Sequence, residues 1–118
     1  MENYNLVRPE HLNHHGSLFG GQLLSWVDEC AWMAAARDFP LSRFVTRAMD
    51  SIEFKHQVKN GSILRFHLIK TRQGNTSVTY LVEVYEDERS SVEEILAFST
   101  SVTFVSVDER GNKKKIPQ

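Results

Sequence analysis

One segment sets the architecture expected for this chain: His11-Leu-Asn-His-His-Gly-Ser-Leu-Phe-Gly-Gly-Gln-Leu-Leu-Ser-Trp-Val-Asp-Glu29, continued by Cys30-Ala-Trp-Met-Ala-Ala-Ala36. It begins as a polar loop, passes through the pair Gly20-Gly21 and becomes a long apolar run. This run predicts a helix from about Gln22 to Arg37, which Asp38-Phe39-Pro40 ends. Because apolar residues lie on nearly every side of it, we expect the helix to be buried.

Alternating apolar and polar residues predict β-strands on both sides of this helix in the sequence. The predicted strands are Asn3 to Arg8, Phe44 to Phe54, Ile63 to Thr71, Val78 to Tyr85 and Ile95 to Val107. A polar loop is expected from Asp87 to Glu93, and a basic tail from Lys113 to Gln118. The order predicts an α+β fold in which a curved antiparallel sheet wraps one long helix, as a single domain over residues 1–118.

Composition excludes several classes of function. The net charge of -1 gives no reason to expect a nucleic acid or an anionic membrane as a partner. A single cysteine, Cys30, provides neither a disulfide framework nor a cysteine-based zinc site. His11, His14 and His15 lie in a loop without a matching cluster of ligands, so no metal site is expected. No signal pattern or spanning segment is present, so we expect a cytoplasmic protein.

Asp28 is the residue that most needs an explanation. Helical spacing places it on the same stripe as Leu24 and Ala31. A carboxylate on an apolar face carries a desolvation cost of several kcal/mol unless it is paired or hydrogen-bonded. This placement indicates a candidate proton-transfer group. The alternative is a structural role, in which Asp28 caps a loop or pairs with Arg47 or another base.

Two neighbouring features favour the functional interpretation. A helix that begins after Gly20-Gly21 exposes unpaired N–H groups, which can hold an oxyanion or a phosphate. The phosphate-loop pattern is not satisfied, because no Lys-Ser/Thr pair follows the glycines. Asn13, in the loop before the glycines, can orient a water or a carbonyl group, although an ordinary turn is the more common role of such an asparagine.

The segment from Asn13 to Glu29 resembles the signature of hotdog-fold acyl-CoA thioesterases, of the bacterial short- and medium-chain type related to cytosolic acyl-CoA hydrolases. The resemblance continues in Phe44 to Phe54, in Asn75-Thr-Ser77 and in Phe104 to Pro117. It implies a thioester hydrolase of fatty acid metabolism that uses no cofactor, since coenzyme A is part of its substrate. It also implies a homodimer as the minimal unit, assembled further into a tetramer or hexamer, with the active site between subunits.

The resemblance also assigns roles to individual residues. Asp28 matches the general base or nucleophile, Asn13 positions water or substrate from the facing subunit, and the N–H groups near Gly20 and Gly21 polarise the carbonyl. Coenzyme A would lie along the backbone of Arg47, Ala48 and Met49 and along the turn strand of Asn75, Thr76, Ser77 and Val78. Arg47, Arg72 and Lys113 to Lys115 are candidates to meet its phosphates, although a solvated tail is the more common role for such a run of lysines.

Two other functions on the same fold remain open. A non-catalytic acyl-CoA sensor has no need of a desolvated acid, so the presence of both Asn13 and Asp28 argues against it. A dehydratase acting on acyl thioesters uses a histidine and an acid, which His14 or His15 with Asp28 would imitate. Those histidines, however, precede the glycines.

Overall fold

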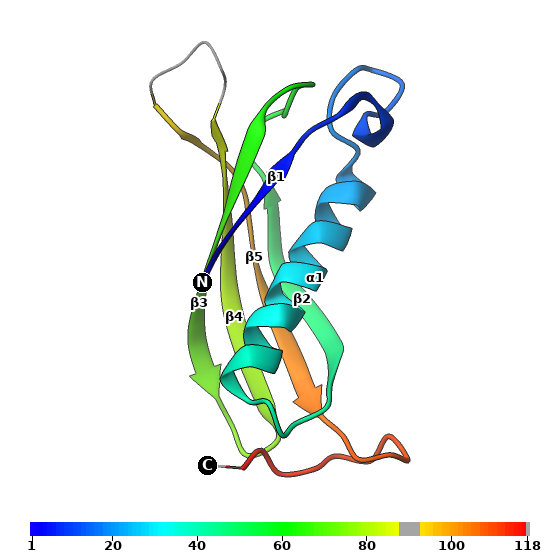
Figure 1. Cartoon of the computed structure of the whole chain (residues 1–118), viewed down its shortest axis with the longest axis vertical. Coiled ribbons are helices and arrows are strands. Elements are labelled where there is room, and N and C mark those ends of the chain that lie inside the picture. Colours follow the sequence, from blue (N-terminus) through cyan, green and yellow to red (C-terminus); the bar gives the residue numbers. More distant parts are fainter. Residues whose placement is uncertain (88–92, 118) are drawn as a thin grey trace.

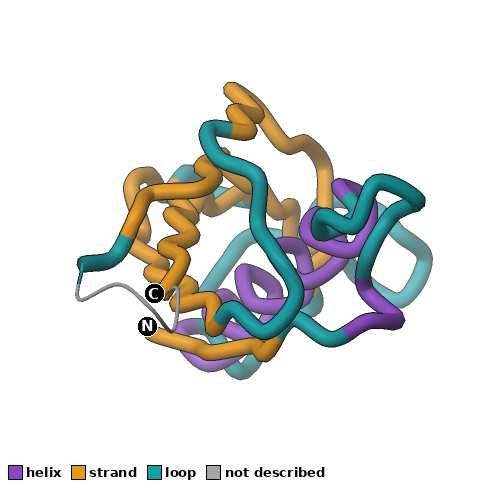
Figure 2. Tube along the Cα trace, turned by 90° about the horizontal axis from the view of Figure 1, so that it is seen from above, coloured by secondary structure: helices purple, strands orange, loops and turns teal. Residues whose placement is uncertain are grey.

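The computed structural model describes residues 1–87 and 93–117. The helical elements are the 3-10 turn η1 (Pro9–His11) and the helix α1 (Gly20–Asp38). The strands are β1 (Glu2–Leu6), β2 (Phe44–Phe54), β3 (Ile63–Gln73), β4 (Ser77–Asp87) and β5 (Ile95–Ser106). Helix α1 lies along one face of the sheet, and the strands curve past it (Figures 1 and 2). The predicted α+β architecture is therefore confirmed.

The core lies between α1 and the inner face of the sheet. Buried and half-buried residues alternate strictly along β4, because successive side chains of a strand point to opposite faces of the sheet. The inner faces of β3 and β5 supply Leu64, Phe66, Phe98 and Phe104, each of which is fully buried. The helix meets them with a stripe at helical spacing: Leu23, Val27, Cys30, Ala31, Ala34 and Ala35.

All neighbouring strands pair antiparallel, in the order β1-β3-β4-β5-β2. Strands β1 and β2 are therefore the two edges of the sheet. The β2 edge is irregular, with register shifts between Thr46 and Ala48 and between Asp50 and Glu53. It also exposes three large apolar side chains: Val45, Ile52 and Phe54. An exposed apolar edge strand is a template for pairing with another chain.

The helix differs from its prediction in two respects. It begins at Gly20, so both glycines lie in its first turn rather than before it. It also has an exposed face that includes Ser25, Glu29 and Trp32, and the Trp32 side chain is 46% exposed. The indole N–H of Trp32 donates to the carbonyl oxygen of Phe44, so this ring covers the flank of β2 rather than the core. The prediction of a helix buried on nearly every side was wrong.

The predicted strands are confirmed with small shifts at their ends. The first strand is displaced toward the N-terminus, and β3 and β4 each extend two residues beyond the expected segment at their C-terminal ends. Of the predicted polar loop, residues 88–92 lie outside the described residues, as does Gln118 of the tail. Within the described chain, neither helix has the apolar length that crossing a bilayer requires.

Candidate active site

Asp28 projects from the third turn of α1 toward β2. Its carboxylate Oδ1 accepts a 2.6 Å hydrogen bond from the Thr46 hydroxyl. Asp28 is half-buried, at the border of the buried stripe that includes Val27 and Ala31. Hydrogen bonding by Thr46 offsets the cost of partial desolvation and fixes the carboxylate, leaving Oδ2 for a reacting group. Among the described residues, neither Arg47 nor another base forms an ion pair with Asp28.

Asn13 forms the centre of a tight turn in the loop that precedes the helix. Its Oδ1 accepts hydrogen bonds from the backbone N–H groups of His15, at 2.9 Å, and Ser17, at 3.2 Å. The Asn13 N–H in turn donates to the Ser17 carbonyl oxygen at 2.7 Å. Since two N–H donors require an oxygen between them, the orientation of the amide is fixed. Asn13 can therefore offer a ligand the two N–H donors of Nδ2, which have no partner within the described chain.

The start of α1 is open to a ligand. The N-cap residue, Phe19, makes no side-chain capping bond, and the first turn carries no acidic residue. Helix geometry leaves the N–H groups of Gly20 and Gly21 without intrahelical acceptors. A Cβ added at Gly21 would lie 2.6 Å from the Phe19 ring, so this position accommodates only glycine while Phe19 stays in place. The positive end of the helix dipole thus faces outward without a protein counter-charge in its first turn.

A cavity of about 310 Å³ joins the Asn13 loop to the helix start. Its wall includes Asn13, Gly20, Phe54 and His56. Asp28 does not line it. Eight residues separate Gly20 from Asp28, which corresponds to about 12 Å along the helix axis. A single chain therefore presents two half-sites: Asn13 with the helix start, and Asp28 with Thr46.

The residues predicted to contact coenzyme A are distributed over three strands. Across the sheet, Val78 on β4 pairs with Phe104 on β5, and Phe104 pairs with Thr46 on β2. Ala48 and Met49 are level with Thr79 and Tyr80, so the segments 76–78 and 47–49 lie at neighbouring levels of the sheet, with β5 between them. The basic tail approaches the β3–β4 turn, because the Ile116 N–H donates to the Asn75 carbonyl oxygen at 2.8 Å. Arg72 lies opposite Thr79, next to a register shift of β3.

The loop histidines have structural contacts. The His11 ring meets Trp26 edge-on at 4.7 Å between centroids, and its Nδ1 accepts from the Arg8 N–H. The rings of His14 and His15 lie 3.9 Å apart. In the described part of the chain, no group of three or more histidine, cysteine, aspartate or glutamate side chains is placed to hold a metal ion.

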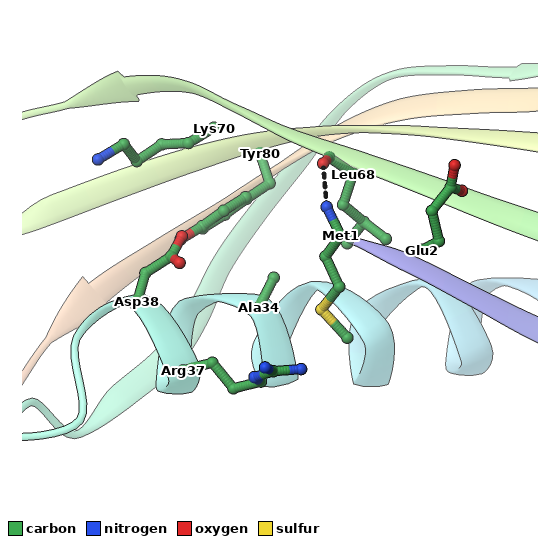
Figure 3. Close-up of a pocket in the computed structure, with 8 residues that line it drawn as sticks. All are labelled: Met1, Glu2, Ala34, Arg37, Asp38, Leu68, Lys70 and Tyr80. Atoms are coloured by element: carbon green, nitrogen blue, oxygen red, sulfur yellow. Dashed lines mark hydrogen bonds between the residues drawn. The ribbon is translucent and has the colours of Figure 1, made fainter.

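A second cavity, of about 450 Å³, lies at the other end of the helix, beside β3 and β4 (Figure 3). There the hydroxyl of the buried Tyr80 donates a 2.6 Å hydrogen bond to the Asp38 carboxylate. Burial raises the pKa of the Tyr80 phenol far above its ordinary value, and Asp38 adds to the shift. This contact joins the C-terminal end of α1 to the sheet and is remote from both half-sites.

Sequence reasoning missed Thr46. A hydroxyl on an edge strand gives no signal of its own, and its contact with Asp28 spans eighteen positions of the chain. It also missed the buried Glu86 of β4, whose position was detectable. Glu86 continues the alternation of Val78, Tyr80, Val82 and Val84, all of which are buried.

A long helix packed on a five-stranded antiparallel sheet is the architecture of a hotdog domain. In this chain the helix carries a carboxylate, Asp28, beside the edge strand β2. The family model of the Thioesterase superfamily matches residues 15–93. An acyl-CoA thioester hydrolase of Zymomonas mobilis, itself uncharacterized, is 36% identical over 112 residues, covering 95% of this chain and 74% of that protein. The chain spans 64% of a Bacillus subtilis relative that is 31% identical. The chain therefore belongs to the thioesterase superfamily.

Solved structures agree with this assignment. An acyl-CoA hydrolase of Staphylococcus aureus, in complex with butyryl coenzyme A and coenzyme A, superposes with a TM-score of 0.89 at 30% identity, covering 99% of this chain and 71% of that one. Variants of that hydrolase replace one asparagine, one aspartate or one threonine by alanine. A hexameric hotdog thioesterase of Campylobacter jejuni gives 0.87 at 34% identity, over 98% and 88% of the two chains.

Proposed function

We propose that this chain is an acyl-CoA thioester hydrolase, which converts acyl-CoA and water to a carboxylic acid and coenzyme A. The observation that carries the proposal is the Asp28 carboxylate held by the Thr46 hydroxyl on the exposed flank of a hotdog helix. The Staphylococcus aureus variants support it. Their replaced asparagine and aspartate are fifteen positions apart, as are Asn13 and Asp28. Their threonine follows the aspartate by seventeen positions, and Thr46 follows Asp28 by eighteen.

Asp28 supplies the chemistry in one of two ways. As a general base, it takes a proton from water, and the hydroxide attacks the thioester carbonyl. As a nucleophile, it attacks the carbonyl itself and forms an anhydride that water then opens. In both, the carbon–sulfur bond breaks, the thiolate leaves and is protonated, and no cofactor takes part. Thr46 donates to Oδ1 and orients the carboxylate, which leaves both lone pairs of Oδ2 available to the reaction.

Asn13 and the first turn of α1 supply the hydrogen-bond donors that hold the reacting groups. The Nδ2 amide group of Asn13 is a donor only, and because the turn engages Oδ1, Nδ2 is the part of the side chain that a ligand meets. It therefore holds either the attacking water by its oxygen or the thioester carbonyl. The N–H groups of Gly20 and Gly21 stabilise the negative charge that develops on the carbonyl oxygen.

The two half-sites meet across a homodimer. The β2 edge, with exposed Val45, Ile52 and Phe54, pairs antiparallel with the same edge of a second copy. Antiparallel pairing places the Phe54 end of one strand beside the Phe44 end of the other. Gly20 lies beside Phe54, and Asp28 lies beside Thr46 near the other end of β2. Pairing thus brings Asn13 of one subunit toward Asp28 of its partner.

Coenzyme A extends from this site along Arg47, Ala48 and Met49 of β2 and along the segment Thr76 to Val78, which lie at neighbouring levels of the sheet on either side of β5. Arg72 and the Lys113 to Lys115 tail, which lies beside Asn75, are available to its phosphates. A hexamer is the proposed full assembly, and the cytoplasm the proposed location. The alternative function, an acyl-CoA sensor, would bind the same ligand without needing Asp28.

The test is release of coenzyme A from a panel of acyl-CoAs by the wild type and by Asp28→Asn. We expect the variant to bind coenzyme A and to lose a factor on the order of 100 to 10,000 in kcat. A wild type that binds acyl-CoA but hydrolyses none of the panel would indicate the sensor. Incorporation of oxygen-18 into Asp28 during one turnover would identify the nucleophile.

A second experiment tests the shared site. Asn13→Ala and Asp28→Ala subunits, each expected to be inactive alone, are co-expressed with different tags and the mixed oligomer is purified. A mixed dimer has one complete site, so we expect up to half of the wild-type activity to return. No recovery would contradict the assignment of Asn13 and Asp28 to different subunits.

A further inference from the structure

Glu86 is a buried carboxylate that the proposed chemistry does not use. It lies on the inner face of β4 and is 0% exposed. Every other residue of that face, from Val78 to Val84, is apolar or aromatic. A buried charge is costly unless nearby groups compensate for it, so its surroundings must provide that compensation.

Within the described residues, the side-chain contacts that compensate Glu86 come from one segment, residues 56–62, which connects β2 to β3. The Ser62 hydroxyl donates to Glu86 Oε2 at 2.6 Å, and the Lys59 N–H approaches the same oxygen at 3.4 Å. His56 Nε2 lies 3.0 Å from Oε1, and within the described chain Oε1 accepts no well-directed hydrogen bond. Glu86 therefore contacts the connecting segment at both of its ends, His56 and Ser62, and in its middle, Lys59, and holds all three positions against β4.

The same connection holds the Asn13 loop. The Leu18 N–H donates to the Val58 carbonyl oxygen at 2.8 Å, and Ser17 and Lys59 form an antiparallel bridge. Ser17 is also the residue whose backbone closes the turn around the Asn13 amide, through bonds in both directions. A continuous path of short contacts thus runs from Glu86 through residues 58–59 to Ser17 and Asn13.

We propose that Glu86 is a positioning residue for the hydrolase reaction: through residues 56–62 it holds the Asn13 turn of its own subunit at the geometry the reaction requires. This rests on the proposed role of Asn13. It predicts that a change at Glu86 disturbs the half-site formed by Asn13 and the helix start. The Asp28–Thr46 half-site of the same chain is unaffected, because its contacts come from β2 and the middle of α1.

The first measurement compares Glu86→Gln with the wild type in steady-state hydrolysis. Glutamine keeps an acceptor for Ser62 and Lys59 but replaces the carboxylate oxygen that faces His56 by an amide group. We expect kcat to fall on the order of tenfold with KM little changed, because a displacement well below 1 Å affects the reacting geometry more than the binding of coenzyme A. The matched control is Glu83→Gln, a half-buried glutamate on the opposite face of the same strand, which should leave both constants unchanged.

The decisive measurement places Glu86→Gln in either subunit of the mixed oligomer described above. The complete site takes Asn13 from the Asp28→Ala subunit and Asp28 from the Asn13→Ala subunit. Glu86→Gln in the subunit that supplies Asn13 should lower activity about as much as in the uniform variant. In the subunit that supplies Asp28 it should have no effect. A general loss of stability would not distinguish the two arrangements.

Equal effects in the two arrangements, or none in either, would overturn the positioning role while leaving the hydrolase and its shared site intact. An inactive mixed oligomer without any change at Glu86 would instead contradict the shared site, and with it the arrangement on which this role rests. Full activity of uniform Asn13→Ala would remove the role of Asn13 and of Glu86 together. These failures appear at different steps and are distinguishable.

Discussion

The Thr46 hydroxyl donates a 2.6 Å hydrogen bond to the Asp28 carboxylate, joining the middle of α1 to the edge strand β2. Loss of a hydrogen bond to a charged group costs about 1.5–3 kcal/mol. We therefore expect Thr46→Val to lower kcat on the order of 10- to 100-fold, measured as release of free thiol from acyl-CoA. Thr46→Ser keeps the hydroxyl and should retain most of the activity. A fully active Thr46→Val would show that Asp28 needs no such support.

The β2 edge provides a prediction about assembly. A charged side chain on an edge strand opposes pairing with another strand, so Ile52→Lys should convert the oligomer to smaller species in analytical ultracentrifugation and abolish hydrolysis. The control is Tyr4→Lys on the other edge strand, where Tyr4 is 59% exposed. It should change neither property. If Tyr4→Lys, and not Ile52→Lys, reduced the assembly, the interface would lie at β1.

Gly21 and Phe19 should show strong coupling in stability. A Cβ at Gly21 would meet the Phe19 ring at 2.6 Å, whereas one at Gly20 would meet Phe54 at an ordinary 3.5 Å. Because the Phe19 ring is 56% exposed and can turn away, Gly21→Ala should destabilise the protein by less than the cost of about 1–3 kcal/mol found in a packed core, as measured by denaturant unfolding. In a Phe19→Ala background, the same change should be neutral or stabilising by up to about 1 kcal/mol, the usual preference of a helix for alanine. Additive effects would contradict the clash.

The Tyr80–Asp38 contact predicts a pH dependence of stability. Burial raises the pKa of Tyr80 in the folded protein, and Asp38 adds to the shift, so the folded state favours the protonated phenol. This contribution is complete below the ordinary tyrosine pKa of about 10 and declines above it. We expect Tyr80→Phe to be less stable than the wild type at pH 8, by about 1 kcal/mol. The difference should shrink between pH 10 and 11.5, as measured by Tm, since only the wild type loses this contribution.

Most of the fold could be predicted because it follows from local patterns. Alternation located the strands, and the apolar run with its flanking Gly and Pro located the helix. The exposed Trp32 could not be predicted, since its hydrogen bond to Phe44 depends on how the helix crosses β2. Glu86 was missed because the predicted strand ended at Tyr85, where the acidic pair Glu86-Asp87 begins, although the alternation of buried residues continues through Glu86.

The candidate site was predictable in part. Helical spacing singled out Asp28, the helix start and its preceding loop indicated the glycines and Asn13, and the resemblance assigned their roles, with Asn13 expected from the facing subunit. The structure places Asn13 with the helix start and Asp28 with Thr46. Their catalytic roles stay predictions. Identifying Thr46 as the partner of Asp28 required the tertiary structure. The orientation of the Asn13 amide required it too, because that orientation depends on a turn closed by Ser17.

The exposed β2 edge has a consequence for how such a protein behaves in solution. Where pairing of two edges completes each reaction centre, specific activity depends on protein concentration and falls on dilution below the dissociation constant of the dimer. Linkage makes the effect reciprocal, because a substrate that contacts both subunits strengthens their association. Acyl-CoA would then promote assembly of the dimer that hydrolyses it, and dilute enzyme should show a lag before reaching its full rate.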